Sequence, residues 1–171
     1  GYREGDPEKY DSELALYPED LIEYLTQTQP VVMANLHQKS GKEQANQHIC
    51  REIARAIDSN GALHSLRRGV EFVGAKFFLL QFKPDNIANA KIQKNYNANI
   101  LRVVRQVRYS PFHQEMKEAT GKGSGILDLT IFVNGIPVAT LELKTDFTQS
   151  VQHAIEQYKK DRKPFNLVTR K

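Results

Sequence analysis

The clearest pattern of hydrophobic and polar positions lies in LDLTIFVNGIPVATLELK, residues 127–144. Apolar and polar residues alternate on both sides of an Asn-Gly pair, which is typical of two antiparallel strands joined by a tight turn. On the core side we expect Leu127, Leu129, Ile131 and Val133 from the first strand, and Ala139, Leu141 and Leu143 from the second. The opposite face then carries Asp128, Thr130, Thr140, Glu142 and Lys144.

The register of this hairpin decides whether its charged residues meet. A two-residue loop at Asn134-Gly135 would place apolar residues opposite charged ones. A three-residue loop that begins one residue earlier, with Gly135 left-handed as a G1 bulge, keeps apolar opposite apolar. It places Asp128 opposite Thr140 and diagonal to Glu142, so we expect the longer loop.

The rest of the chain predicts a mixed order of helices and strands. Helices are expected at about 19–26, closed by Pro30, within 39–61, in a short piece of 85–95 and within 145–163. Further strands are expected at 75–82, buried on both faces, at 99–110 and at 165–170. The predicted fold class is α/β, with a mixed central β-sheet flanked by helices. We expect one domain, with residues 1–40 as an N-terminal extension and a core from about 42 to 171.

Composition excludes several classes of protein. The 171 residues are 40% hydrophobic and 26% charged, which is typical of a soluble globular domain. No apolar run approaches the roughly 18 residues that span a bilayer, so no membrane association is expected. Cys50 is the single cysteine, which favours a reducing, cytoplasmic setting and a buried, inert thiol. The net charge of +4 is a weak indication of a polyanionic partner.

The charged face of the hairpin suggests a metal site. Two carboxylates on one face repel each other unless a cation lies between them, and hard oxygen ligands suit Mg²⁺. Lys144, two residues after Glu142, can position or help to deprotonate a metal-bound water. The set of Asp128, Glu142 and Lys144 therefore fits metal-assisted hydrolysis of a phosphodiester. The alternative is an exposed sheet face whose charges are solvated or weakly paired.

Asp128 followed by Glu142-Leu143-Lys144 resembles the motif of the PD-(D/E)xK nuclease superfamily. TQTQP, RQVRYS, the hairpin and AIEQYKKDR, in that order, resemble the N-terminal endonuclease region of the restriction (R) subunit of type I restriction–modification enzymes. The resemblance runs from about residue 17 to 162. It implies Mg²⁺, for which Mn²⁺ can substitute, held by Asp128, Glu142 and the backbone carbonyl of Leu143. It also implies that Asp128, Glu142 and Lys144 are catalytic, with Lys144 assisting the attacking water.

The resemblance also implies partners. These are double-stranded DNA and the modification and specificity subunits, whereas ATP belongs to motor domains of the full-length subunit that we do not expect in this chain. A related group carries a Gln-x-x-x-Tyr motif, whose nearest match begins at Gln157, with Asp161 in place of the tyrosine. In some members an acidic residue before the point where this chain starts completes the metal site, and Glu43 and Glu52 are weak substitutes.

Four residues are candidates for contact with DNA: Gln157, Arg102, Gln106 and Arg108. Three of them share one parity in RVVRQVR and could present a polar stripe to phosphates, although the solvated face of an edge strand would look the same. Two other functions remain open. One is a DNA-repair nuclease of the same superfamily, and the other is a catalytically inactive nucleic-acid-binding module with the same fold.

Overall fold

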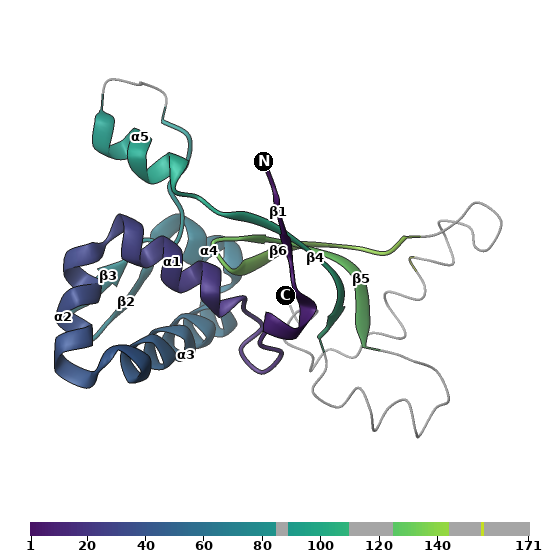
Figure 1. Cartoon of the computed structure of the whole chain (residues 1–171), viewed down its shortest axis with the longest axis horizontal. Coiled ribbons are helices and arrows are strands. Elements are labelled where there is room, and N and C mark those ends of the chain that lie inside the picture. Colours follow the sequence, from purple (N-terminus) through teal and green to yellow (C-terminus); the bar gives the residue numbers. More distant parts are fainter. Residues whose placement is uncertain (85–88, 110–124, 144–154, 156–171) are drawn as a thin grey trace.

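A computed structural model describes residues 1–84, 89–109, 125–143 and 155 of the chain (Figure 1). The helices are α1 (Pro18–Thr28), α2 (Pro30–Ser40), α3 (Lys42–Asn60), α4 (Ala62–Arg68), α5 (Ala90–Asn97) and the 3-10 helix η1 (Pro7–Lys9). The strands are β1 (Arg3–Gly5), β2 (Val70–Phe72), β3 (Ala75–Phe77), β4 (Leu101–Arg108), β5 (Ile126–Val133) and β6 (Ile136–Leu141). Of the helix predicted within 145–163, only Ile155 is described, and it is helical. The strand predicted at 165–170 lies outside the described residues.

Four strands form one mixed sheet in the order β1-β4-β5-β6. β1 runs parallel to β4, and the other neighbours are antiparallel. β2 and β3 form a separate two-stranded sheet. The helices gather toward one end of the large sheet, whereas parts of β4 and β5 extend away from them (Figure 1). This arrangement confirms the predicted fold class, a mixed sheet flanked by helices.

Proline residues begin the first two helices. Pro18 and Pro30 each lie in a first turn, where the N–H that proline lacks would have no intrahelical partner. Pro30 therefore closes α1, as predicted, and also begins α2, which the sequence pattern did not predict. The pattern of α2 is weak because Met33 is its one buried residue.

The predicted long helix is confirmed as α3. Ala45, Ile49 and Ile53 are buried at helical spacing, and Gly61, with a φ of +87°, follows the last residue of the helix. Cys50 is buried on the same helix, as predicted, and burial raises the pKa of its thiol to about 11. The short elements α4 and β2, which follow Gly61, were not predicted.

The strand predicted at 75–82 is shorter than expected. β3 ends at Phe77, and the prediction that both faces are buried is wrong. Phe77 and Leu79 are buried, but Phe78 and Phe82 are more than half exposed. β3 pairs with β2 alone, and a two-stranded ribbon covered on one side leaves its other face in solvent.

Two buried clusters hold the layers together. The larger cluster joins α1, α2 and α3 to β2 and β3, and its members include Leu25, Met33, Ile53 and Phe77. The smaller cluster consists of Tyr10, Tyr17, Val104, Val107, Tyr109, Leu127 and Phe132. Residues before position 40 therefore pack in both clusters and cover part of the large sheet.

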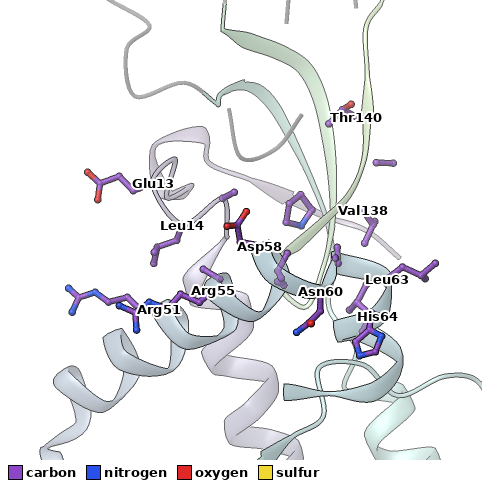
Figure 2. Close-up of a pocket in the computed structure, with 18 residues that line it drawn as sticks. Glu13, Leu14, Arg51, Arg55, Asp58, Asn60, Leu63, His64, Val138 and Thr140 are labelled. Atoms are coloured by element: carbon purple, nitrogen blue, oxygen red, sulfur yellow. The ribbon is translucent and has the colours of Figure 1, made fainter. Parts of the chain in front are cut away.

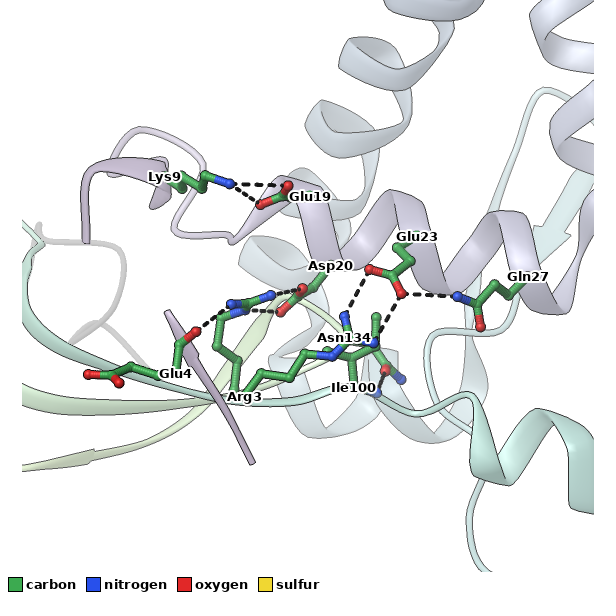
Figure 3. A network of polar contacts seen from close by, with 10 residues as sticks. Arg3, Glu4, Lys9, Glu19, Asp20, Glu23, Gln27, Ile100 and Asn134 are labelled. Atoms are coloured by element: carbon green, nitrogen blue, oxygen red, sulfur yellow. Dashed lines mark hydrogen bonds and ion pairs between the residues drawn. The ribbon is translucent and has the colours of Figure 1, made fainter. Parts of the chain in front are cut away.

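The turn between β5 and β6 is buried under the start of α1. Asn134 and Gly135 have φ values of +49° and +79°, which is typical of a two-residue type I′ turn. The fully buried Asn134 side chain donates to the carbonyl oxygen of Leu79 (2.9 Å) and accepts from the N–H of Ile100 (2.7 Å; Figure 3). The carbonyl oxygen of Gly135 accepts from the N–H of Tyr17 (2.8 Å). A Cβ at Gly135 would lie 2.4 Å from the Tyr17 carbonyl oxygen, so only glycine fits there.

This turn has two residues, whereas we predicted three. Val133 pairs with Ile136, so the predicted G1 bulge at Gly135 is wrong. The contacts of Asn134 provide the physical reason. A longer loop under α1 would have to keep the Asn134 side chain bonded to the Ile100 N–H and the Leu79 carbonyl, because these buried groups are costly to leave without a partner.

A β-bulge further along the hairpin restores the predicted match of faces. The register shifts by one between the pairs Phe132–Pro137 and Ile131–Ala139, which leaves Val138 as an extra residue in β6. Beyond the bulge, apolar positions lie opposite apolar positions. The bulge in β6 thus produces the one-residue shift in register that the sequence pattern placed in the turn.

We expect Asn134→Gly to lower the free energy of unfolding by about 3 kcal/mol, because it leaves buried backbone groups of Leu79 and Ile100 without their partner. Glycine still accepts a positive φ, so the loss reports the hydrogen bonds and not the turn conformation. Urea unfolding followed by circular dichroism measures it. The control is Val73→Gly in the exposed β2–β3 turn, where φ is +51°, and it should shift stability by less than about 1 kcal/mol. Equal effects in the two variants would contradict the role of Asn134.

Candidate functional site

One row of polar side chains crosses three adjacent strands. Leu129 pairs with Leu141, and the same register carried one step further places Asp128 opposite Glu142. On its other side Asp128 lies opposite Gln106, between the flanking pairs of β4 and β5. The sequence predicted a diagonal relation between the two acids, but the bulge makes them direct neighbours. Side chains that lie directly opposite have Cβ atoms about 5 Å apart, within reach of one shared ion.

The Asp128 carboxylate has a donor on each side. Its Oδ2 accepts a hydrogen bond of 2.8 Å from the backbone N–H of Leu143, just past the end of β6. Its Oδ1 lies 3.5 Å from Nε2 of Gln106 on β4, a longer contact. Gln106 was predicted as a DNA contact only. Its position beside Asp128 depends on the β4–β5 register, which no local sequence signal sets.

The other predicted site residues lie at the end of β6 or beyond. Glu142 is half-buried and Leu143 is exposed. The contact from its N–H places the Leu143 backbone beside Asp128, where the predicted carbonyl ligand is needed. Lys144 and Gln157, the other two predicted site residues of this part of the chain, lie outside the described residues.

The donor set around Asp128 fits a hard divalent cation. Two carboxylates and a nearby main chain offer oxygen ligands of the kind that Mg²⁺ takes, and Mg²⁺ usually completes its shell with water. Within the described ranges, no group of three or more His, Cys, Asp or Glu side chains is placed to hold a metal ion. An ion at Asp128 and Glu142 would therefore depend on these two side chains, backbone oxygen and water.

The buried face of the hairpin differs from the prediction. Thr130 is fully buried, although it was predicted on the face opposite the core, and Phe132, two residues further on, is fully buried as well. The rings of Tyr10 and Tyr17 pack against Phe132 at centroid distances of 5.8 and 5.9 Å, so the N-terminal segment covers this part of the sheet. Three residues expected on the core side are exposed: Ala139, Leu141 and Leu143. The expected burial is therefore wrong for these three residues, whereas Leu127 of β5 is buried as predicted.

A comparison with models of protein families gives a match over residues 4–170, to the type I restriction enzyme R protein N terminus (HSDR_N). The chain belongs to this family. The match covers nearly the whole chain and includes the row of Gln106, Asp128 and Glu142. The resemblance based on the order of motifs is thus confirmed at the level of the family. Neither the curated proteins nor the solved structures yielded a match.

In this R-protein region, the side chain of Arg102, a predicted DNA contact, is hydrogen-bonded to other residues of the same chain. Its guanidinium donates to both carboxylate oxygens of the fully buried Asp20, at 2.6 and 2.7 Å, and to the carbonyl oxygen of Glu4. It also lies over the ring of Tyr17, 4.5 Å from the centroid. The hydrogen bond with Asp20 raises the pKa of Arg102. Arg102 thus anchors α1 and β1 to β4 through Asp20 and Glu4, which Figure 3 labels in the polar network around α1.

The other two residues of the predicted stripe have different neighbours. Arg108 is exposed and lies 3.9 Å from Glu8 of η1, a weak pair that leaves the guanidinium accessible. Gln106 faces Asp128. The structure therefore does not bring Arg102 together with Gln106 and Arg108 as one surface.

A hollow of about 860 Å³ lies beside β6 in the R-protein region (Figure 2). Side chains of α3, α4 and β6 line it, among them Arg51, Asp58, His64 and Thr140. Asp128 and Glu142 do not belong to its lining.

Of the two weak substitutes on α3, Glu52 forms an ion pair with Arg55, and Glu43 borders a second hollow next to Lys42. Neither acid is described in contact with Asp128. None of the helices in the described part of the chain has the length and apolar character needed to cross a membrane.

We expect Arg102→Ala to lower the free energy of unfolding by about 3–5 kcal/mol, because it leaves Asp20 charged and buried without a partner. Chemical denaturation of the chain measures this loss. The matched control is Arg105→Ala on the same strand, whose pair with Glu4 is more than 70% exposed on both sides, and it should cost less than about 1 kcal/mol. A small effect for Arg102→Ala would show that Arg102 does not anchor α1.

Proposed function

We propose that this R-protein region is a Mg²⁺-dependent DNA endonuclease module of a type I restriction enzyme. The observation that carries the proposal is the direct opposition of Asp128 and Glu142 on neighbouring strands, with the Leu143 backbone against Asp128. Membership in the family adds the context of restriction. The substrate in this proposal is double-stranded DNA, and the reaction is hydrolysis of a phosphodiester bond.

The proposed ion would be held by Asp128, Glu142 and the carbonyl oxygen of Leu143. A residue in extended conformation directs its N–H and C=O toward the same neighbouring strand. The Leu143 N–H that reaches Asp128 therefore favours the carbonyl of the same residue as a ligand on that side. At such a site Mg²⁺ supplies polarisation of a phosphate oxygen and activation of water.

The side chains of this region supply the rest of the chemistry. Among the described residues, each oxygen of Asp128 has at most one donor, and since a carboxylate oxygen offers two acceptor sites, a lone pair on each remains for an ion. Lys144 follows Glu142 at the spacing that returns to the same strand face, so in this proposal its amine lies near the attacking water and offsets developing negative charge. Arg108 and Gln157 are the proposed contacts to DNA.

The remaining partners are part of the same proposal. The modification and specificity subunits would supply recognition of the DNA sequence. ATP would act in motor domains of the R protein, which feed DNA to this site. The family description, R protein N terminus, agrees with a module that works within such an assembly.

We expect Asp128→Asn and Glu142→Gln each to weaken Mn²⁺ binding by at least tenfold, since each removes a charged ligand. Lys144→Ala should leave Mn²⁺ affinity within about threefold of the wild type yet abolish DNA cleavage in the assembled restriction enzyme, because an amine does not ligate the ion. Isothermal titration calorimetry of the chain and a plasmid-cleavage assay of the complex measure the two effects.

The control is Glu71→Gln on β2, an exposed acid paired with Lys76, which should leave both readouts unchanged. Wild-type metal affinity in both acid variants, or wild-type cleavage in any of the three site variants, would contradict the proposal.

A further inference from the structure

We propose that Gln106 is a positioning residue of the candidate metal site, which holds the Asp128 carboxylate in the orientation needed to bind the ion. This inference rests on the proposed function, because it assigns a residue to that same site. Gln106 would not touch the metal. It would act through Asp128, from the strand on the side opposite Glu142.

The backbone of Gln106 is unusual for the interior of a strand. Its φ is +57°, in the left-handed region that residues with a side chain rarely adopt. Among the described residues, three others that are not glycine have a positive φ: Ala15, Val73 and Asn134. All three lie in turns, whereas Gln106 lies within β4. Strained conformations of this kind persist where the surrounding structure imposes them, and they concentrate at functional sites.

The strained residue interrupts the alternation of β4. Val104 and Val107 are three positions apart, yet both are buried in the cluster that contains Tyr10 and Phe132. Between them, Arg105 and Gln106 are both exposed, so burial along this part of β4 does not alternate residue by residue. The register is the same before and after Gln106, so the strained backbone leaves the strand pairing intact while the Gln106 side chain meets Asp128.

Chemistry determines which atom of the Gln106 side chain faces the acid. A carboxylate only accepts hydrogen bonds, so the amide nitrogen is the group that lies 3.5 Å from Asp128 Oδ1. Leu143 donates to Oδ2 from the other side. One donor lies on β4 and the other just past the end of β6, so the two approach from either side of β5 and together restrict rotation of the carboxylate. With these two donors, counted among the described residues, each oxygen keeps a lone pair for an ion.

A purely structural explanation makes a different prediction. If the irregularity served only to bury Val104 and Val107, any residue that tolerates a positive φ would suffice, and glycine would do so best. Gln106→Gly separates the two explanations, because it relaxes the backbone and removes the amide at once. Val73→Gly is the matched control, since Val73 has a φ of +51° at an exposed turn far from β4 in the sequence.

The experiment measures Mn²⁺ affinity by isothermal titration calorimetry and the thermal midpoint by circular dichroism, for the full chain and its variants. We expect Gln106→Gly to keep or raise the thermal midpoint and to weaken Mn²⁺ binding by about 10- to 100-fold, the usual effect of losing a group that orients a ligand. Val73→Gly should keep or raise the midpoint and leave Mn²⁺ affinity unchanged.

The outcomes distinguish this inference from the proposed function. If the wild type binds Mn²⁺, Asp128→Asn does not, and Gln106→Gly binds as the wild type does, the role of Gln106 is overturned while the proposed site stands. If the wild type does not bind Mn²⁺, or if Asp128→Asn binds equally well, the proposed site is overturned, and the role of Gln106 with it. Weaker binding in Gln106→Gly and Val73→Gly alike would also overturn it, because the loss would not be specific to the amide.

Discussion

The buried side chain of Asn134 is the interaction on which the arrangement of the site depends. It connects the β5–β6 turn to Leu79 and to the residue that precedes β4, so the turn can lie in only one place under α1. With the turn fixed, the hairpin register is fixed, because a slip of one residue would move every side chain to the other face. The bulge at Val138 then brings Asp128 opposite Glu142. The hydrogen bonds of Asn134 at one end of the hairpin, together with the bulge at Val138, thus determine which acids meet toward the other end.

This arrangement separates stability from chemistry within one sheet. The helices and the larger cluster pack near the Asn134 turn, and the ion pair between Arg102 and Asp20 ties α1 to β4 in the same region. The acidic pair lies further along β5 and β6, on a part of the sheet where Glu142 and Leu143 extend past the last paired residue. In the proposed function, these two acids at the end of a firmly held hairpin would meet a large polymeric substrate without weakening the core.

Sequence patterns were sufficient to predict elements of the fold where local signals are strong. The hairpin, α3, the strand with the arginines and the mixed fold class were predicted from periodicity and from the Asn-Gly pair, and the order of motifs indicated the family. Sequence patterns were insufficient where tertiary contacts determine the conformation or the burial of a residue.

The three-residue loop was wrong because the burial of Asn134 cannot be read from local alternation. The placement of Thr130 on the face opposite the core did not predict its burial, because Tyr10 and Tyr17, which pack against the nearby Phe132, lie more than 100 residues earlier. Arg102 was grouped with possible DNA contacts because its partner, Asp20, is distant in the sequence.

The central claim is that Asp128 and Glu142 share one divalent ion. A crystal of the chain soaked in Mn²⁺, with the anomalous signal of manganese recorded, tests this claim most directly. The account predicts one strong peak bonded to an oxygen of each carboxylate and to the Leu143 carbonyl, at about 2.0–2.3 Å. A peak bound elsewhere, or Asp128 and Glu142 without an ion between them in a crystal soaked to saturation, would contradict it.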